Sequence, residues 1–234
     1  MSVRNLIDEL GKDLEGYATT RAFPRELPAS DAAEVAAFVH ERVEVAIEDR
    51  IKSLASSGKT IACARGCNGC CEEPIMVFRP EAARVAEWLA RPENADALAR
   101  FLEAYPAWEA AIGETVTQLS AIYETDQKSF VAHHIGAWRE RVLCAFNRDG
   151  ECTVYPVRPT VCRTSHALGS NEHCSGAAEG KAIRYDFVPL DNFVERTRIL
   201  LLATHNAMAG QRGRPEALPL AVHALLTSPR SVDG

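Results

Sequence analysis

The sequence predicts a mainly α-helical single domain that encloses a cysteine-rich loop region, and three observations support this class. Apolar residues recur every three or four positions through long stretches, which is the period of amphipathic helices. The 234 residues, 47% hydrophobic and 25% charged, have the composition of an ordinary globular protein. The eight cysteines gather in two groups. We therefore expect one domain over residues 1–234, with residues 1–29 and 228–234 loosely ordered.

The first two helices have recognisable start and stop signals. The first is expected to begin at Ser30 or Asp31, either of which can serve as its N-cap, and to stop at Gly58. Pro80 suits the first turn of a second helix, and Pro92 closes that helix. The two helices leave a gap for the first cysteine group between them.

The later helices are expected in four stretches. A third helix lies near residues 98–102, and a longer one over residues 107–143 is expected to be bent or broken in the polar stretch 124–129. A C-terminal helix follows over residues 194–208, and a weaker one covers residues 218–226.

The first cysteine group occupies residues 63–71 and reads Cys63-Ala-Arg-Gly-Cys67-Asn-Gly-Cys70-Cys71. Gly66 and Gly69 stand where the chain must turn tightly to aim successive sulfurs at one centre. Two residues between Cys67 and Cys70 is the spacing of metal-binding knuckles. Adjacent side chains tend to diverge, so either Cys70 or Cys71 is expected to serve a second site, a redox partner or packing.

The second cysteine group occupies residues 144–174, within a stretch rich in glycine and proline that is expected to be loop. A turn at 147–150 would bring Cys144 and Cys152 together. A centre with four thiolates carries a net charge of about −2, so Arg158 and Arg163 have an electrostatic reason to lie beside it. We expect these two arginines to contribute to cofactor binding.

Metal ligation is the chemistry that these cysteines favour. The N-terminus lacks the features of a secretion signal, so we expect a cytoplasmic protein whose thiols are kept reduced. The expected centre is an iron-sulfur cluster, most simply [4Fe-4S], or zinc. Four ligands would come from a pool of five, and the other three cysteines would form a second site or a reserve. The pool is Cys63, Cys67, Cys70, Cys152 and Cys162; the reserve is Cys71, Cys144 and Cys174.

Charge and hydropathy bear on the partners. A formal net charge of −6 argues against a grip on nucleic acid, which relies on clustered Lys and Arg. No apolar run approaches the roughly 20 residues that a membrane-spanning helix needs. The expected partners are therefore the metal ion or cluster and a protein partner or substrate.

The cysteine pattern resembles the YkgJ-like CxxCxxCC family of zinc- or iron-chelating cysteine cluster proteins. The resemblance covers residues 63–88 and 144–174, and it rests on the first cysteine group and on a later string. That string reads Tyr155-Pro-Val-Arg-Pro-Thr-Val-Cys162-Arg163. The resemblance implies metal chelation through the cysteines. The motif is also similar to that of flagellin lysine N-methylases, but the chain has no glycine-rich S-adenosylmethionine loop.

Several alternatives remain open at this point. The spacing from Cys63 to Cys70 also occurs in radical S-adenosylmethionine enzymes, but the β/α barrel pattern of those enzymes is missing. His166 and His173 lie beside cysteines and could complete a zinc site. The centre could serve an enzyme or redox protein, a structural site, or a storage and delivery protein.

Other polar residues are given ordinary roles. Glu72 and Glu73 are expected in a solvated turn, because adjacent carboxylates point apart and do not converge for acid-base work. Five histidines on predicted helices are assigned to the surface or to packing. They are His40, His133, His134, His205 and His223.

Overall fold

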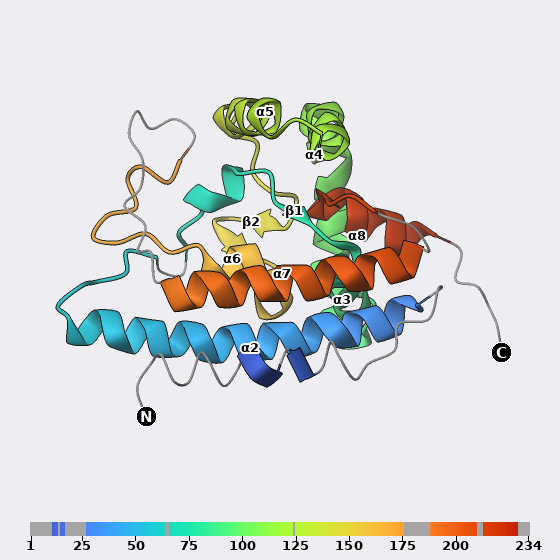
Figure 1. Ribbon diagram of the computed structural model, residues 1–234. Helices are drawn as coiled ribbons and strands as arrows, with labels where there is room; N and C mark the ends of the chain where they lie inside the picture. The colour runs from blue at the N-terminus through green and yellow to red at the C-terminus, as the bar shows by residue number, and fades with distance from the viewer. Residues whose placement is uncertain are drawn as a thin grey trace.

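The fold is mainly α-helical, as the sequence predicts, with only short strands among the residues described. The computed structural model describes residues 11–13, 15–16, 27–63, 66–123, 125–175, 188–209 and 213–228. Most of the two termini that were expected to be loosely ordered lies outside these ranges. Figure 1 shows the arrangement of the helices.

The long helix α2 (Ala29–Ser56) forms one side of the molecule. It packs against α3 (Arg79–Leu89) and α7 (Val188–Ala209), and α2 and α7 lie side by side in Figure 1. Helix α2 begins slightly before the expected Ser30 or Asp31, with Pro28 at the N-cap position. It ends before Gly58, whose φ of +73° favours glycine.

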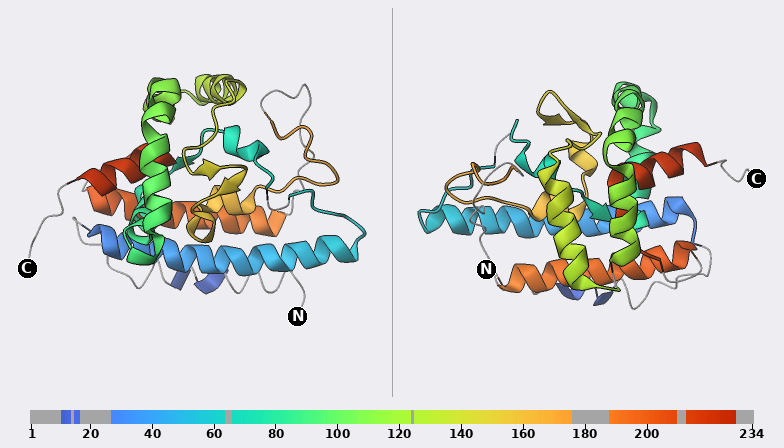
Figure 2. Two further views of the ribbon diagram at one scale, coloured as in Figure 1. Left: turned by 180° about the vertical axis from the view of Figure 1, so that it is seen from behind. Right: turned by 90° about the horizontal axis from the view of Figure 1, so that it is seen from above.

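Helices α4 (Ala95–Ile122) and α5 (Gln127–Arg139) differ from the expected pattern in one respect. The expected third helix and the start of the fourth are one continuous helix that passes through Pro106. The expected break occurs between α4 and α5, where the Asp126 side chain caps α5 by accepting the Ser129 N–H at 2.9 Å. Helix α4 runs across the direction of α2 (Figure 2).

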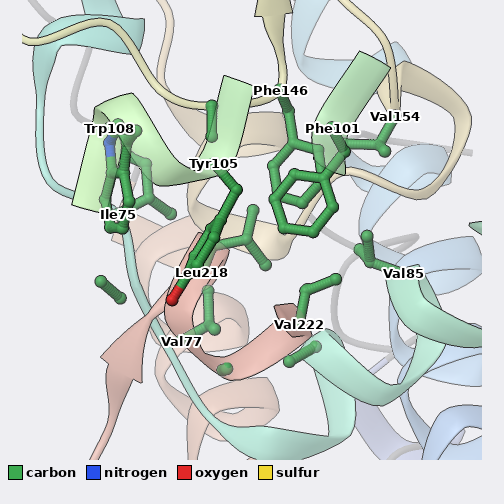
Figure 3. Packing of buried hydrophobic residues seen from close by; sticks show 14 of the residues in the cluster. Ile75, Val77, Val85, Phe101, Tyr105, Trp108, Phe146, Val154, Leu218 and Val222 are labelled. Carbon is green, nitrogen blue, oxygen red and sulfur yellow. The ribbon is translucent and has the colours of Figure 1, made fainter. Parts of the chain in front are cut away.

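The larger core lies where α3, α4 and α8 (Leu218–Thr227) meet. Strand β1 (Met76–Val77) pairs antiparallel with β4 (Glu216–Ala217) at its edge. The rings of Phe101 and Phe146 stack in its middle with centroids 4.3 Å apart (Figure 3). Phe146 follows Cys144 by two residues, so this core reaches the second cysteine group. A separate core joins α2 to α7.

The stretch 144–175 contains short regular elements where the sequence suggests only loop. They are β2 (Asn147–Arg148), β3 (Glu151–Cys152), the 3₁₀ turn η3 (Tyr155–Val157) and α6 (Thr160–Thr164). Two other 3₁₀ turns are η1 (Gly69–Glu72) and η2 (Pro92–Asn94). Helix α6 packs against α2. The second cysteine group is therefore attached to the helical frame through α6.

The length and hydropathy of the helices show whether any of them could span a membrane. Within the described part of the chain, no helix combines the length and the apolar character needed to cross a bilayer.

Candidate metal centre

The segment just before the first cysteine group pairs through its backbone with the later part of the second group. Ala62 donates its N–H to the Ala167 carbonyl at 2.9 Å, and Gly169 donates to the Thr60 carbonyl at 3.0 Å. The Ala167 N–H also lies 3.2 Å from the Cys63 sulfur. The entry to the first cysteine group thus lies against the end of the second.

Two further contacts join the same regions. The Asn171 side-chain amide donates to the Cys67 sulfur at 3.2 Å. A Cβ placed on Gly69 would lie only 2.7 Å from the Cβ of Cys174, so glycine permits the close approach of Cys174. Residues 167–174 therefore cover the first cysteine group.

Turn η1 carries Cys70 and Cys71 toward the second group. The Cys144 N–H donates to the Cys71 carbonyl at 2.8 Å, which fixes the two groups against each other. A hydrogen bond with Cys71, followed by burial, raises the pKa of the Cys70 thiol well above its usual range. The expectation that these adjacent side chains diverge is wrong, because the two thiols are close enough to hydrogen-bond.

The hairpin of β2 and β3 confirms the expected turn at 147–150. Asp149 and Gly150 have φ of +53° and +84°, as a type I′ turn requires, and Asn147 pairs with Cys152. The turn returns Cys152 toward Cys144. The Cys152 thiol is close enough to raise the pKa of the Cys144 thiol.

Four thiols from three segments lie near enough to one another to affect each other's ionisation. Burial raises the pKa of Cys144 to about 12, and the nearby Cys152 and Cys70 add to this rise. Burial also raises the pKa of Cys162 well above its usual range, with further contributions from Cys144, Cys70 and Cys152. Burial and Cys70 raise the pKa of Cys152. Every pair among these four thiols therefore interacts electrostatically.

Backbone N–H groups and a guanidinium partly offset the effect of burial. The N–H of Phe146 hydrogen-bonds to the Cys144 thiol, and the N–H of Val154 does the same for Cys152. Both donors come two residues after the cysteine that they contact. Arg158 lies near enough to lower the pKa of Cys152. Hydrogen bonds and positive charge are what a thiolate needs in order to persist away from water.

The two arginines of the later string have different surroundings. The Arg163 guanidinium is buried and donates to the Arg158 carbonyl at 2.7 Å, to the Pro156 carbonyl at 2.7 Å and to Glu44 in α2 at 2.6 Å. Arg158 stacks over the Tyr155 ring at 3.7 Å. Arg163 therefore fixes the loop that carries Cys162, while Arg158 is the arginine whose charge reaches a thiol.

Glu72 departs from the expected solvated turn. Its carboxylate is buried and accepts hydrogen bonds from Arg141 at 3.3 Å and from the Ser175 hydroxyl at 2.6 Å. The expectation is wrong for this residue because the return of the chain at 174–175 covers it. Glu72 thus helps to hold the second cysteine group over the first.

The two histidines near the second group lie in different environments. Burial lowers the pKa of His166, and the charges of Arg50 and Arg158 lower it further, so the ring is neutral near pH 7. His173 is half-buried, and its Nε2 lies 3.2 Å from Oε1 of Glu172. A neutral imidazole is able to bind a metal, so His166 has the better chemistry of the two.

The donor set can be compared with the two expected metal centres. Within the ranges described, no group of three or more His, Cys, Asp or Glu side chains is arranged to hold a metal ion. The chemistry of the four interacting thiols nevertheless fits a zinc tetrathiolate or an iron-sulfur cluster, both of which use four cysteines. A cation would replace the thiol protons and supply the charge that ionisation in a buried place requires.

Described residues line a small cavity beside the cysteines and a larger groove on the helical frame. The small cavity is bounded by Cys71, Cys144, Trp108 and Ile112, at the border between the cysteines and the larger core. The groove, of about 470 Å³, lies between α2 and α3 and is lined by Arg84, Glu87 and other charged residues.

The sequence and structure were also compared with known proteins. No protein-family model, curated protein or solved structure matches this chain. The resemblance to the YkgJ-like family stays a prediction from the cysteine pattern.

Proposed function

We propose that this protein binds a metal centre through Cys70, Cys144, Cys152 and Cys162, and that the centre is an iron-sulfur cluster. The observation that carries the proposal is the mutual electrostatic interaction of these thiols, which come from η1, the β2–β3 hairpin region and α6. Residues 70 and 162 are more than ninety positions apart in the sequence. Each of these thiols makes the ionisation of the others less favourable, and a bound cation would offset this cost if the four became thiolates.

The surroundings of the thiols support a cluster. Cys144, Cys152 and Cys162 pack against the larger core, which includes Phe146, Val154 and Val157. Such apolar cover limits the access of water, and hydrogen bonds to the sulfurs tune a cluster's potential. Zinc is the alternative with the same ligands, because a tetrahedral site also takes four cysteines.

The role that we propose for the cluster is redox or cluster-dependent chemistry on a protein partner or a substrate. A centre of this kind takes up and releases an electron without loss of its ligands. A structural zinc site would stay fully coordinated, and its removal would unfold the protein. A storage or delivery protein would release its metal readily to a competing chelator.

The proposal is tested by anaerobic purification, an absorption spectrum, and iron, sulfide and zinc analysis of the same sample. A band near about 400 nm with iron and acid-labile sulfide is expected. Cys162→Ser is expected to lose the metal, whereas Cys63→Ser, outside the four, is expected to keep it. A colourless protein that contains zinc would show that the centre is the alternative zinc site. A wild-type protein without bound metal would refute the proposal.

A further inference from the structure

Glu81 is a buried carboxylate in the first turn of α3, and it contacts two other elements. It is 5% exposed. Its Oε1 accepts the backbone N–H of Thr160 at 2.6 Å and lies 3.1 Å from Nε2 of His40. These contacts join α3 to α6 and to α2. The sequence does not reveal them, because 79 and 41 positions separate Glu81 from its two partners.

His40 acts on Glu81 as a neutral donor. Its ring is 1% exposed, and burial lowers its pKa even though the hydrogen bond to Glu81 opposes this. Neutral imidazole carries one N–H, and an ionised carboxylate is acceptor-only. The proton therefore lies on Nε2 and points at Glu81. This bond and the bond from Thr160 share the Oε1 atom of Glu81, so both hold the same carboxylate oxygen.

Thr160 is the first residue of α6, and Cys162 follows two positions later. Helix α6 has only five residues and is too short to be stable without tertiary contacts. Its position is set by the Glu81 bond to Thr160 and by the Arg163 bond to Glu44. The charge of Glu81 is also felt at the Cys162 thiol.

We propose that Glu81 is a positioning residue for the metal centre: it holds the first turn of α6 so that Cys162 faces the other three cysteines, and His40 holds Glu81. This inference rests on the proposed function. In this proposal the buried pair of Glu81 and His40 helps to retain the metal without binding it directly. Partners that support metal ligands in this way typically affect metal affinity by about 10- to 100-fold.

The experiment compares variants that break the hydrogen bond between the Thr160 N–H and Glu81 with variants that change a side chain but keep this bond. Thr160→Pro removes the backbone donor and the threonine side chain and puts the ring Cδ against the Glu81 carboxylate; proline otherwise fits the first position of a helix, and Pro159 already has the extended ψ of 165° that a following proline requires. Thr160→Ala keeps the N–H and is its matched control. Glu81→Ala removes the acceptor, and Glu81→Gln restores an acceptor without the charge. Glu87→Ala, on the exposed face of α3, controls for changes in that helix.

Metal retention is measured on anaerobically purified full-length protein as the fraction of metal kept against increasing chelator. Thr160→Pro and Glu81→Ala are expected to need at least about tenfold less chelator for half release. Thr160→Ala and Glu87→Ala are expected to match the wild type, and Glu81→Gln to recover most of the loss. If the centre is an iron-sulfur cluster, Glu81→Gln is also expected to raise its reduction potential, because a nearby negative charge is removed.

The outcomes distinguish this inference from the proposed function. A metal-free wild type refutes the function and the inference with it. A metal-loaded wild type whose Thr160→Pro and Glu81→Ala variants hold metal equally well refutes the inference alone. If those two variants do not fold by circular dichroism, Glu81→Gln decides: a folded variant that lacks metal, as Cys162→Ser does, would refute the inference, and a folded variant that keeps most of its metal would support it.

Discussion

Replacing Arg163 with lysine tests how the loop that carries Cys162 is held. The guanidinium makes three short bonds in three directions, to Glu44 and to the carbonyls of Pro156 and Arg158. Lysine keeps the charge but presents one nitrogen on a flexible stem, so it can replace at most one of these contacts well. At 6% exposure, water cannot easily reach the carbonyls that are left behind.

The size of the effect follows from the bonds that are lost. A hydrogen bond to a charged group contributes about 1.5 to 3 kcal/mol, and two such bonds are lost, so the free energy of unfolding is expected to fall by about 3 kcal/mol. Glu44 is 39% exposed and can be rehydrated, which keeps the cost at the lower end. For a chain of this size the melting temperature would fall by roughly 6 to 12 °C.

Urea unfolding of the wild type and of Arg163→Lys measures this difference. Arg198→Lys is the matched control, because Arg198 also contacts a carboxylate, through two 2.9 Å bonds to Glu195. Its side chain is 42% exposed and that of Glu195 is 55% exposed, so the change there is expected to stay below about 1 kcal/mol. An Arg163→Lys variant as stable as this control would refute the argument that Arg163 fixes the loop.

Three further predictions concern the helical frame. Pro106→Ala is expected to stabilise the protein by about 2 kcal/mol, because proline inside α4 removes a helix hydrogen bond, and a thermal unfolding midpoint no higher than that of the wild type would contradict this. Phe101→Ala is expected to cost about 3 to 5 kcal/mol in urea unfolding, since it leaves a cavity against Phe146; a cost below about 1 kcal/mol would contradict the packing. Burial, followed by the charge of Arg79, lowers the pKa of His205 to about 4, so this histidine favours folding above its unfolded pKa of about 6.5. The stability it contributes, on the order of 2 kcal/mol, is lost as pH falls from about 6.5 to 4, and His205→Gln should show a smaller drop in urea midpoint over that range than the wild type.

Local signals were sufficient for much of the helical frame. The apolar period of α2, the early proline of α3 and the polar break before α5 were all visible in the sequence. The turn at 147–150 was visible too, because Asp149 and Gly150 are residue types that adopt positive φ. The expected separation between the helix near residues 98–102 and the helix from residue 107 was wrong, since Tyr105 and Trp108 pack in the larger core on both sides of Pro106 and α4 is continuous.

The sequence alone could not assign the environment of individual polar residues. Glu72 looked solvated, and it is covered by Ser175 and Arg141. His40 was assigned to the surface or to packing and is buried, but no sequence signal indicated its contact with Glu81 in another helix. The contacts of both residues join positions far apart in the chain, which have no local signature.

By itself, the sequence determined that the protein is mainly helical and that its cysteines lie in two groups, because helix period and residue type are local properties. The tertiary structure decided which thiols come together. It places Cys144 where Cys70, Cys152 and Cys162 affect its ionisation or are affected by it, whereas the sequence pattern predicted Cys144 as a reserve ligand. It also decided what holds α6 in place. These relations depend on how α2, α3 and α6 pack, and packing is set by the shape of the whole core.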